Sequence, residues 1–191
     1  SLYSFGYLNF RRGESAGYYR LPSQSRVPLY GFPNGFLPLL TPVIEDRFIT
    51  LGYKTSFSGW QLNSSYTYGF NSIQYNLKNS LNSSIGPSSP TDFYCGNLIF
   101  SHNLININLL TNVDLGLNEN LQIGIGAELR YEKFIQLNGD ESSYLSGNYS
   151  DSLFYDGEWI IRESYPAGSQ MFPGYMPDNE INKSRNNVSA Y

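Results

Sequence analysis

LQIGIGAELRYEKFIQ, residues 121–136, decides the fold of this 191-residue chain. Its odd positions are apolar from Leu121 to Tyr131, whereas its even positions from Gln122 to Glu132 are polar, charged or glycine. Alternation with a period of two is typical of a β-strand with one apolar face. A soluble strand typically has about 5–6 residues, whereas a strand that crosses a bilayer at a tilt needs about 9–11. The length of the segment therefore favours a membrane-spanning strand.

Similar alternation elsewhere predicts further long strands and two hairpins. The predicted strands are residues 1–11, 49–57, 60–70, 105–115, 121–136 and 185–191. Ser58-Gly59 forms a tight turn in the first hairpin, and residues 116–120, rich in turn formers, connect the second. The chain is therefore predicted to be all-β, with an antiparallel sheet of about six strands.

The connections between these strands alternate in length. Residues 12–46, 71–93 and 138–184 are long loops, whereas 58–59 and 116–120 are short. Outer-membrane barrels have long extracellular loops and short periplasmic turns, whereas loops of this length count against a compact soluble domain. The order predicts an antiparallel transmembrane β-barrel.

The composition agrees with this fold. Charged residues make up 15% and aromatic residues 16% of the chain, against about 25% charged residues in an ordinary domain. Such surfaces suit the inner wall and loops of a barrel, or an extracellular sugar-binding protein. The net charge of −4 argues against nucleic-acid binding, and the single cysteine excludes an internal disulfide. The chain has no initiating Met and no signal peptide, so we expect it to begin inside a longer protein.

Several short motifs follow one another between residues 20 and 191. They are FPNGFLP (32–38), NSLNSSIG (79–86), SPTDF (89–93), GAELRYE (126–132), GD (139–140), SY (143–144), SQMFPG (169–174) and SRNNVSAY (184–191). Taken together, they resemble the barrels of TonB-dependent outer-membrane receptors. The resemblance implies that residues 1–191 are part of one receptor barrel, about six of roughly 22 strands, without the plug domain and the C-terminal strands.

This resemblance also implies a function. Receptors of this family import a ligand such as an iron chelate, cobalamin or a glycan across the bacterial outer membrane. The TonB energy-coupling complex drives import and acts through the plug domain. The expected partners are thus outer-membrane lipid, the TonB complex and a ligand that the sequence does not identify. No catalysis and no cofactor are expected.

Charged side chains on the segment above are the first candidates for ligand contact. Glu128, Arg130 and Glu132 share one face of the predicted strand. Paired carboxylates are also the residues of glycoside hydrolysis, but the intervening Arg would lower the pKa of both acids, which is unfavourable for a general acid. We interpret the three residues as a charged inner wall. His102 and Cys95 lack the further ligands of a zinc site, so His102 is interpreted as a polar wall residue.

The longest loop, 138–184, combines acidic and aromatic residues. Its acidic residues are Asp140, Glu141, Asp151, Asp156 and Glu158, which could bind calcium but lack EF-hand spacing. Its candidate ligand-binding aromatics are Tyr144, Tyr149, Trp159 and Tyr165. Exposed loop aromatics bind sugars or aromatic chelators, and they also pack loops together. Both interpretations remain open from the sequence.

Three other protein classes compete with the receptor. One is a passive porin or an adhesin-type outer-membrane protein, which a plug domain upstream would exclude. Another is a soluble extracellular carbohydrate-binding β-sandwich, which predicts short strands and an apolar face packed on a second sheet. The third is an enzyme that uses Glu128 and Glu132. Because open sheet edges and an uncovered apolar face are unfavourable in water, we expect that this chain alone does not fold stably there.

Overall fold

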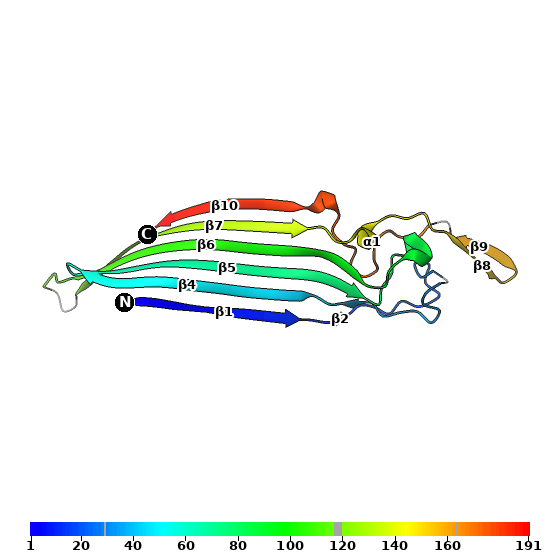
Figure 1. The fold of residues 1–191 in the computed structure, drawn as a ribbon, viewed down its shortest axis with the longest axis horizontal. Helices are drawn as coiled ribbons and strands as arrows, with labels where there is room; N and C mark the ends of the chain where they lie inside the picture. Colours follow the sequence, from blue (N-terminus) through cyan, green and yellow to red (C-terminus); the bar gives the residue numbers. More distant parts are fainter. Residues whose placement is uncertain (29, 117–119, 163) are drawn as a thin grey trace.

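A computed structural model of the chain describes residues 1–28, 30–116, 120–162 and 164–191. The fold is all-β, with 57% of residues in strands and 7% in helices. One long antiparallel sheet dominates the molecule (Figure 1). None of the helices in the described ranges is long and apolar enough to cross a membrane. The prediction of an all-β antiparallel fold is confirmed.

Long strands form the main path of the sheet in the order β1-β4-β5-β6-β7-β10, and each is antiparallel to its neighbours. They are β1 (Leu2–Arg12), β4 (Val43–Phe57), β5 (Trp60–Lys78), β6 (Phe93–Val113), β7 (Leu121–Leu137) and β10 (Ile181–Ala190). Successive long strands are thus neighbours in space, as in a meander. β1 and β10 form the two edges of this path, and the sheet is not closed into a barrel.

The two ends of the sheet differ. The turn end, at the left of Figure 1, carries the β4–β5 turn, in which Ser58 and Gly59 both have positive φ, 47° and 82°. Two positive φ values match the twist of a two-residue hairpin, so this predicted turn is confirmed. The loop end carries the remaining short elements. These are β2 (Ser15–Ala16), β3 (Leu39–Leu40), η1 (Ser83–Ser88), α1 (Glu141–Tyr144), β8 (Asp151–Tyr155), β9 (Glu158–Arg162) and η2 (Pro177–Asn179).

Several predicted boundaries were wrong, in the same direction. The loops 12–46, 71–93 and 138–184 are shorter than expected, because β4 begins at Val43, β5 continues to Lys78 and β10 begins at Ile181. In the β5 extension the alternation continues through Ile73, Tyr75 and Leu77, whereas the β4 and β10 extensions lack it. Of the predicted turn 116–120, residues 117–119 lie outside the described residues.

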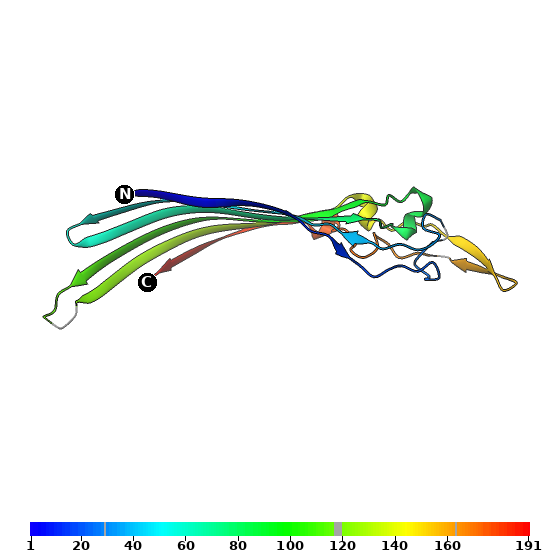
Figure 2. The same ribbon diagram turned by 90° about the horizontal axis from the view of Figure 1, so that it is seen from below.

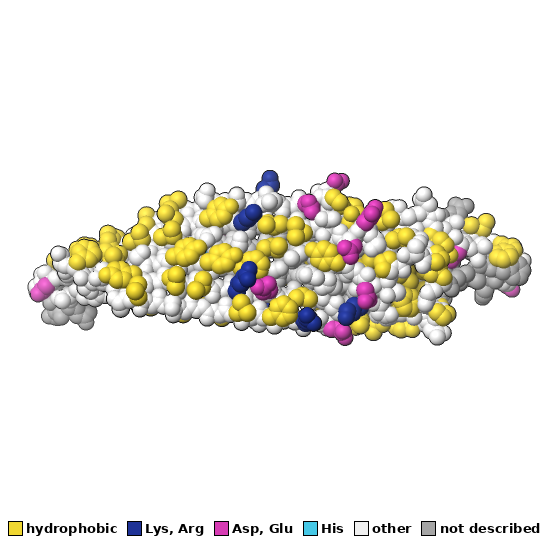
Figure 3. Space-filling model, in the orientation of Figure 1, with side chains coloured by type: hydrophobic (Ala, Val, Ile, Leu, Met, Phe, Trp, Pro, Cys, Tyr) yellow, Lys and Arg dark blue, Asp and Glu magenta, His cyan; other side chains and the backbone are white. Residues whose placement is uncertain are grey.

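The two faces of the sheet have opposite polarity. The register places Leu51, Ile105 and Leu129 on one face, here called the outer face, and Thr50 and Glu132 on the other, the inner face. Leu129 is 50% exposed, whereas Thr50 and Glu132 are only 5% and 8% exposed. Apolar side chains cover much of the outer face (Figure 3), and the sheet bends and twists along its length (Figure 2). Along the central strands β4 to β7 the more polar face is therefore the more shielded one, whereas the edge strands β1 and β10 are largely exposed on both faces.

The buried apolar core lies at the loop end instead of along the sheet. One cluster joins Val27, Phe36 and Leu81, and the other joins Leu77, Phe93 and Cys95. The first contains residues of the connections 13–42 and 79–92. The second is covered by Met171 and Phe172 from the connection between β7 and β10, among others. The loops thus pack on each other and on the strand ends.

Candidate functional site

The inner face of β7 carries a ladder of charges. Arg130 Nη2 lies 2.8 Å from Glu128 Oε1, and Arg130 Nη1 lies 3.9 Å from Glu132 Oε1. β10 adds a cation to the other side of Glu132, because Arg185 is paired with Glu132 in the register and donates to its Oε2 through Nε. Asn187 Nδ2 donates to the same oxygen at 3.1 Å. Glu128, Arg130 and Glu132 therefore belong to one network, as predicted, and Arg185 completes it.

His102 faces this network from β6. It is paired with Glu132 on one side and with Gly69 on the other, and its ring lies against the space that a Gly69 side chain would fill. No group of three or more His, Cys, Asp or Glu side chains suited to a metal ion occurs among the described residues. The structure therefore places His102 in the polar wall. Cys95 lies elsewhere, buried at the loop end.

Aromatic residues of the longest loop do not form one surface. The rings of Tyr149 and Tyr165 are stacked at 6.0 Å between centroids, and Tyr30 meets Tyr149 edge-on at 5.2 Å. Trp159 is 67% exposed on β9, whereas Tyr165 is 6% exposed. Tyr144, the last residue of α1, is half-buried. Of the four predicted candidates, only Tyr149 and Tyr165 are brought together.

Burial changes the chemistry of this tyrosine cluster. Desolvation, aided by the nearby Tyr149 and Tyr165 and by the carboxylate of Asp151, raises the pKa of the Tyr30 phenol above its ordinary value. Desolvation first and Asp151 second also raise the pKa of Tyr149. The phenols of Tyr30 and Tyr149 are therefore neutral at physiological pH, and they act as apolar rings and hydrogen-bonding groups.

Polar side chains tie the loops of the loop end together. Asn82 is fully buried, and its Nδ2 donates to the carbonyl oxygens of Ser142 and Leu145 at 2.9 and 2.8 Å. Gln170 Nε2 donates to the carbonyl oxygen of Arg26 at 2.7 Å, and Ser83 Oγ donates to the same oxygen at 2.7 Å. These bonds join the connections 13–42, 79–92 and 138–180, and we call them the loop frame. Asn82, Ser83 and Gln170 come from the NSLNSSIG and SQMFPG motifs.

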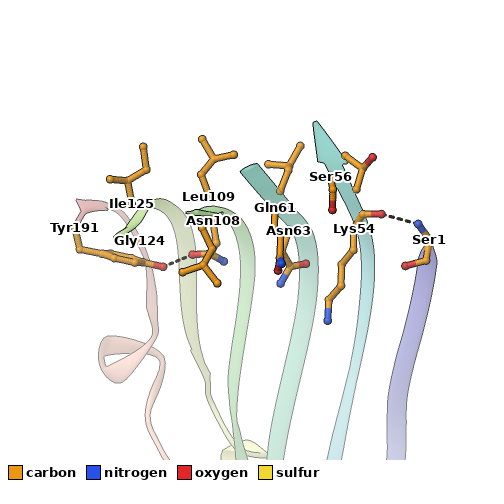
Figure 4. A pocket seen from close by; sticks show the side chains of 13 residues that line it. Ser1, Lys54, Ser56, Gln61, Asn63, Asn108, Leu109, Gly124, Ile125 and Tyr191 are labelled. Carbon is orange, nitrogen blue, oxygen red and sulfur yellow. Dashed lines mark hydrogen bonds between the residues drawn. The ribbon is translucent and has the colours of Figure 1, made fainter. Parts of the chain in front are cut away.

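A further hollow lies at the turn end of the inner face (Figure 4). Its cavity volume is about 800 Å³, and its polar lining includes Lys54, Asn63 and Asn108. Tyr191 borders it, and its hydroxyl donates to Asn108 Oδ1. Gly124 leaves a gap in the wall between these strands (Figure 4). This hollow could not be identified from the sequence, because its residues come from the four strands β4 to β7 and from the two terminal residues Ser1 and Tyr191.

Ion pairs engage the charged side chains of the inner face. The charges of Glu128, Arg130 and Glu132 are paired with one another or with Arg185. Cation pairing keeps a carboxylate ionised, whereas a glycosidase needs one protonated carboxylic acid. The sequence could have indicated Arg185, since it is the second residue of the SRNNVSAY motif, but its pairing with Glu132 depends on the β7–β10 register.

Comparisons of the chain with protein-family models, with curated protein sequences and with solved structures gave no match. The fold and the site geometry are therefore the observations on which a function is argued.

Proposed function

We propose that this chain is part of the barrel wall of a bacterial outer-membrane receptor that imports a ligand. One observation carries the proposal: on the central strands β4 to β7 the apolar face is the exposed one (Figure 3), and the polar face is the more shielded one. A soluble sheet buries its apolar face in a core, and monomeric soluble proteins rarely expose large apolar patches. A membrane barrel reverses this arrangement, since its apolar face meets lipid.

The extent of the apolar face supports a bilayer. On β4 the outer-face residues from Phe57 to Ile49 are uncharged, and the next outer-face residue toward the loop end is Arg47. On β7 the outer-face residues from Leu121 to Tyr131 are uncharged, and the next outer-face residue toward the loop end is Lys133. Segments of about 9–11 residues span the hydrocarbon core at a tilt. We call this uncharged outer surface the apolar band.

Aromatic residues near both borders of the apolar band support the same assignment. Phe57 and Trp60 are paired at the turn end, and Tyr68 and Tyr131 lie near the border with the loop end. Aromatic rings gather at the two membrane–water interfaces of outer-membrane barrels, because one part of the ring is apolar and another is polar. In the proposed orientation the loop end is extracellular and the turn end is periplasmic.

Edge strands require partners in this environment. β1 and β10 each expose one unpaired edge, and unpaired backbone groups are unfavourable in lipid. We infer that further strands continue the sheet from both edges and close the barrel. The inner face, with the charge ladder of Glu128, Arg130, Glu132 and Arg185, then faces the interior.

The motifs that resemble TonB-dependent receptors support energy-coupled uptake over passive flow. NSLNSSIG and SQMFPG supply the loop frame, which holds three long connections in one packed body at the proposed extracellular end. Such a body is suited to bind a ligand such as an iron chelate, cobalamin or a glycan. The TonB complex would act through a plug domain outside residues 1–191.

Labelling of neighbouring cysteines tests the membrane assignment. Ile105 and Asn106 are adjacent on β6 but face opposite sides of the sheet. In cells that express the full protein, Ile105→Cys should react with a lipid-soluble maleimide and resist a charged one, and Asn106→Cys should react with the charged one. The parent, with buried Cys95, gives the background. A β-sandwich would leave Ile105→Cys unreactive to both reagents, and this result would refute the proposal.

Uptake assays separate the receptor from a porin. We would test radiolabelled iron chelates, cobalamin and glycans. The uptake rate of one of these compounds should saturate as its concentration rises, and uptake of that compound should stop in cells that lack TonB. Uptake of every tested compound at the same rate with and without TonB would instead indicate a passive channel.

A further inference from the structure

A shallow groove lies on the outer face, between β6, β7 and β10. Its volume is about 330 Å³. Its apolar lining residues are Ile105, Leu129 and Val188, and its polar ones are Asn103, Tyr131 and Asn186, together with Arg130 and Asn187, which the register assigns to the inner face. The register orders them into rows across the three strands: Ile105, Leu129 and Val188 form one row, and Asn103, Tyr131 and Asn186 form the next toward the loop end. The groove is therefore apolar at one end and polar at the other.

The side chain of a lysine, Lys133, lies beyond the polar end of the groove. The next row toward the loop end is Ser101, Lys133 and Ser184, about 7 Å further along the strands. No ion pair of Lys133 occurs among the residues that the structure describes. An amine between two hydroxyl-bearing residues is a combination that binds phosphate oxygens.

Two asparagine side chains lie in the polar row. The hydroxyl of Tyr66 donates to Asn103 Oδ1 at 2.6 Å, which leaves the amide nitrogen Nδ2 on the other side of the group. Asn186 supplies a second amide on β10. The row thus places hydrogen-bond donors between the Lys133 amine and the apolar row.

We propose that this groove binds a phosphate-bearing lipid of the outer leaflet, with the phosphate at Lys133 and an acyl chain along Ile105, Leu129 and Val188. The inference rests on the proposed function, since it requires the outer face to meet lipid. Free phosphate would use only the polar rows, and the apolar row next to them is the reason to assign an amphiphile. A cation near a membrane surface contributes about 1 kcal/mol of attraction to an anionic lipid.

Native mass spectrometry of the full detergent-extracted protein tests this inference with dioleoyl phosphatidic acid as the probe. We expect phosphatidic acid to bind more tightly than dioleoylglycerol, which has the same chains without phosphate. Lys133→Gln should weaken phosphatidic acid binding about fivefold, and Lys133→Arg should retain it. Lys183→Gln is the matched control, because Lys183 is paired with Phe134 and lies on the inner face; it should bind as the parent does.

Three results would overturn the inference: unchanged binding in Lys133→Gln, equal losses in Lys133→Gln and Lys183→Gln, or displacement of phosphatidic acid by millimolar inorganic phosphate. The last result would indicate a free-phosphate site. Labelling of Ile105→Cys separates this failure from failure of the proposed function. If the lipid-soluble maleimide reacts there while phosphatidic acid binding does not depend on Lys133, only the lipid site is wrong.

Discussion

The ring of Tyr3 on β1 lies directly over Gly52 on β4, in the space that a side chain at position 52 would fill. The Tyr3 hydroxyl crosses to β5 and donates to Asn63 Oδ1 at 2.9 Å. An aromatic ring over a glycine also occurs at His102 and Gly69 on the same inner face. Aromatic side chains that cover glycines fix the register of neighbouring strands.

We therefore expect Gly52→Ala to destabilise the sheet by about 1–3 kcal/mol, because the new methyl group would displace the Tyr3 ring. Unfolding in urea, followed by tryptophan fluorescence of the detergent-solubilised protein, measures the change. Gly124→Ala is the control, since its methyl group would meet Leu110 Cδ1 at an ordinary 3.6 Å. Equal urea midpoints of unfolding for Gly52→Ala and the parent would show that packing of the Tyr3 ring does not require a glycine at position 52.

Removal of the central loop-frame residue should loosen the loops. Asn82→Ala would leave the partly buried carbonyls of Ser142 and Leu145 without the Asn82 amide, at a cost of about 2–4 kcal/mol for the lost pair of bonds. Limited proteolysis should then cleave the 138–180 connection faster than in the parent. Asn148→Ala, at an exposed position of the same connection, should leave the rate unchanged. Equal rates in both variants would contradict the role of the frame.

The tyrosine cluster and the exposed tryptophan should respond differently to truncation. Tyr149→Ala removes a ring packed on Tyr30 and Tyr165, so we expect a loss of about 2–4 kcal/mol. Trp159→Ala should change stability by less than about 0.5 kcal/mol, because this side chain is largely exposed. Urea unfolding with a near-ultraviolet circular dichroism readout compares the two. A larger loss for Trp159→Ala would show that the hairpin, and not the tyrosine cluster, holds the loop.

Thiol chemistry reports on the loop-end core. Cys95 lies at the loop end of β6, beyond the apolar band, and burial raises the pKa of its thiol to about 11. The raised pKa means that the folded state favours the protonated thiol. The stability that this buried, protonated thiol contributes is therefore fully present below about pH 8.5 and is lost as the pH rises through about 11. Alkylation by iodoacetamide at pH 8 should therefore be slow in the folded protein and fast in urea. Rapid alkylation without urea would show that the core opens.

Much of the sheet could be predicted from the sequence, because strand alternation is a local signal. Leu121–Tyr131 and the Ser58-Gly59 turn were identified in this way. The β8–β9 hairpin was missed, although Asp156 and Gly157, both with positive φ, form an Asp-Gly turn that favours a hairpin. It was missed because residues 138–184 were predicted to form one long loop without strands.

Other parts of the site could not be predicted, because they depend on residues far apart in the sequence. Gln170 bonds to the backbone of Arg26 across 144 positions, and Glu132 meets Arg185 only once the β7–β10 register is set. The alternation of Glu128, Arg130 and Glu132 predicted a shared face correctly. The aromatic candidates were harder, since burial of Tyr165 and exposure of Trp159 follow from loop packing that no local pattern encodes.

The loop frame also bears on how the loop end can change over time. Its side chains hold the neighbouring connections mainly by their main-chain carbonyls, as Asn82 does at Ser142 and Leu145, and as Gln170 does at Arg26. A carbonyl accepts the same bond whatever side chain its residue carries. The side chains at positions 26, 142 and 145 can therefore change while the backbone stays in place, so the same scaffold can present a different loop surface without being rebuilt.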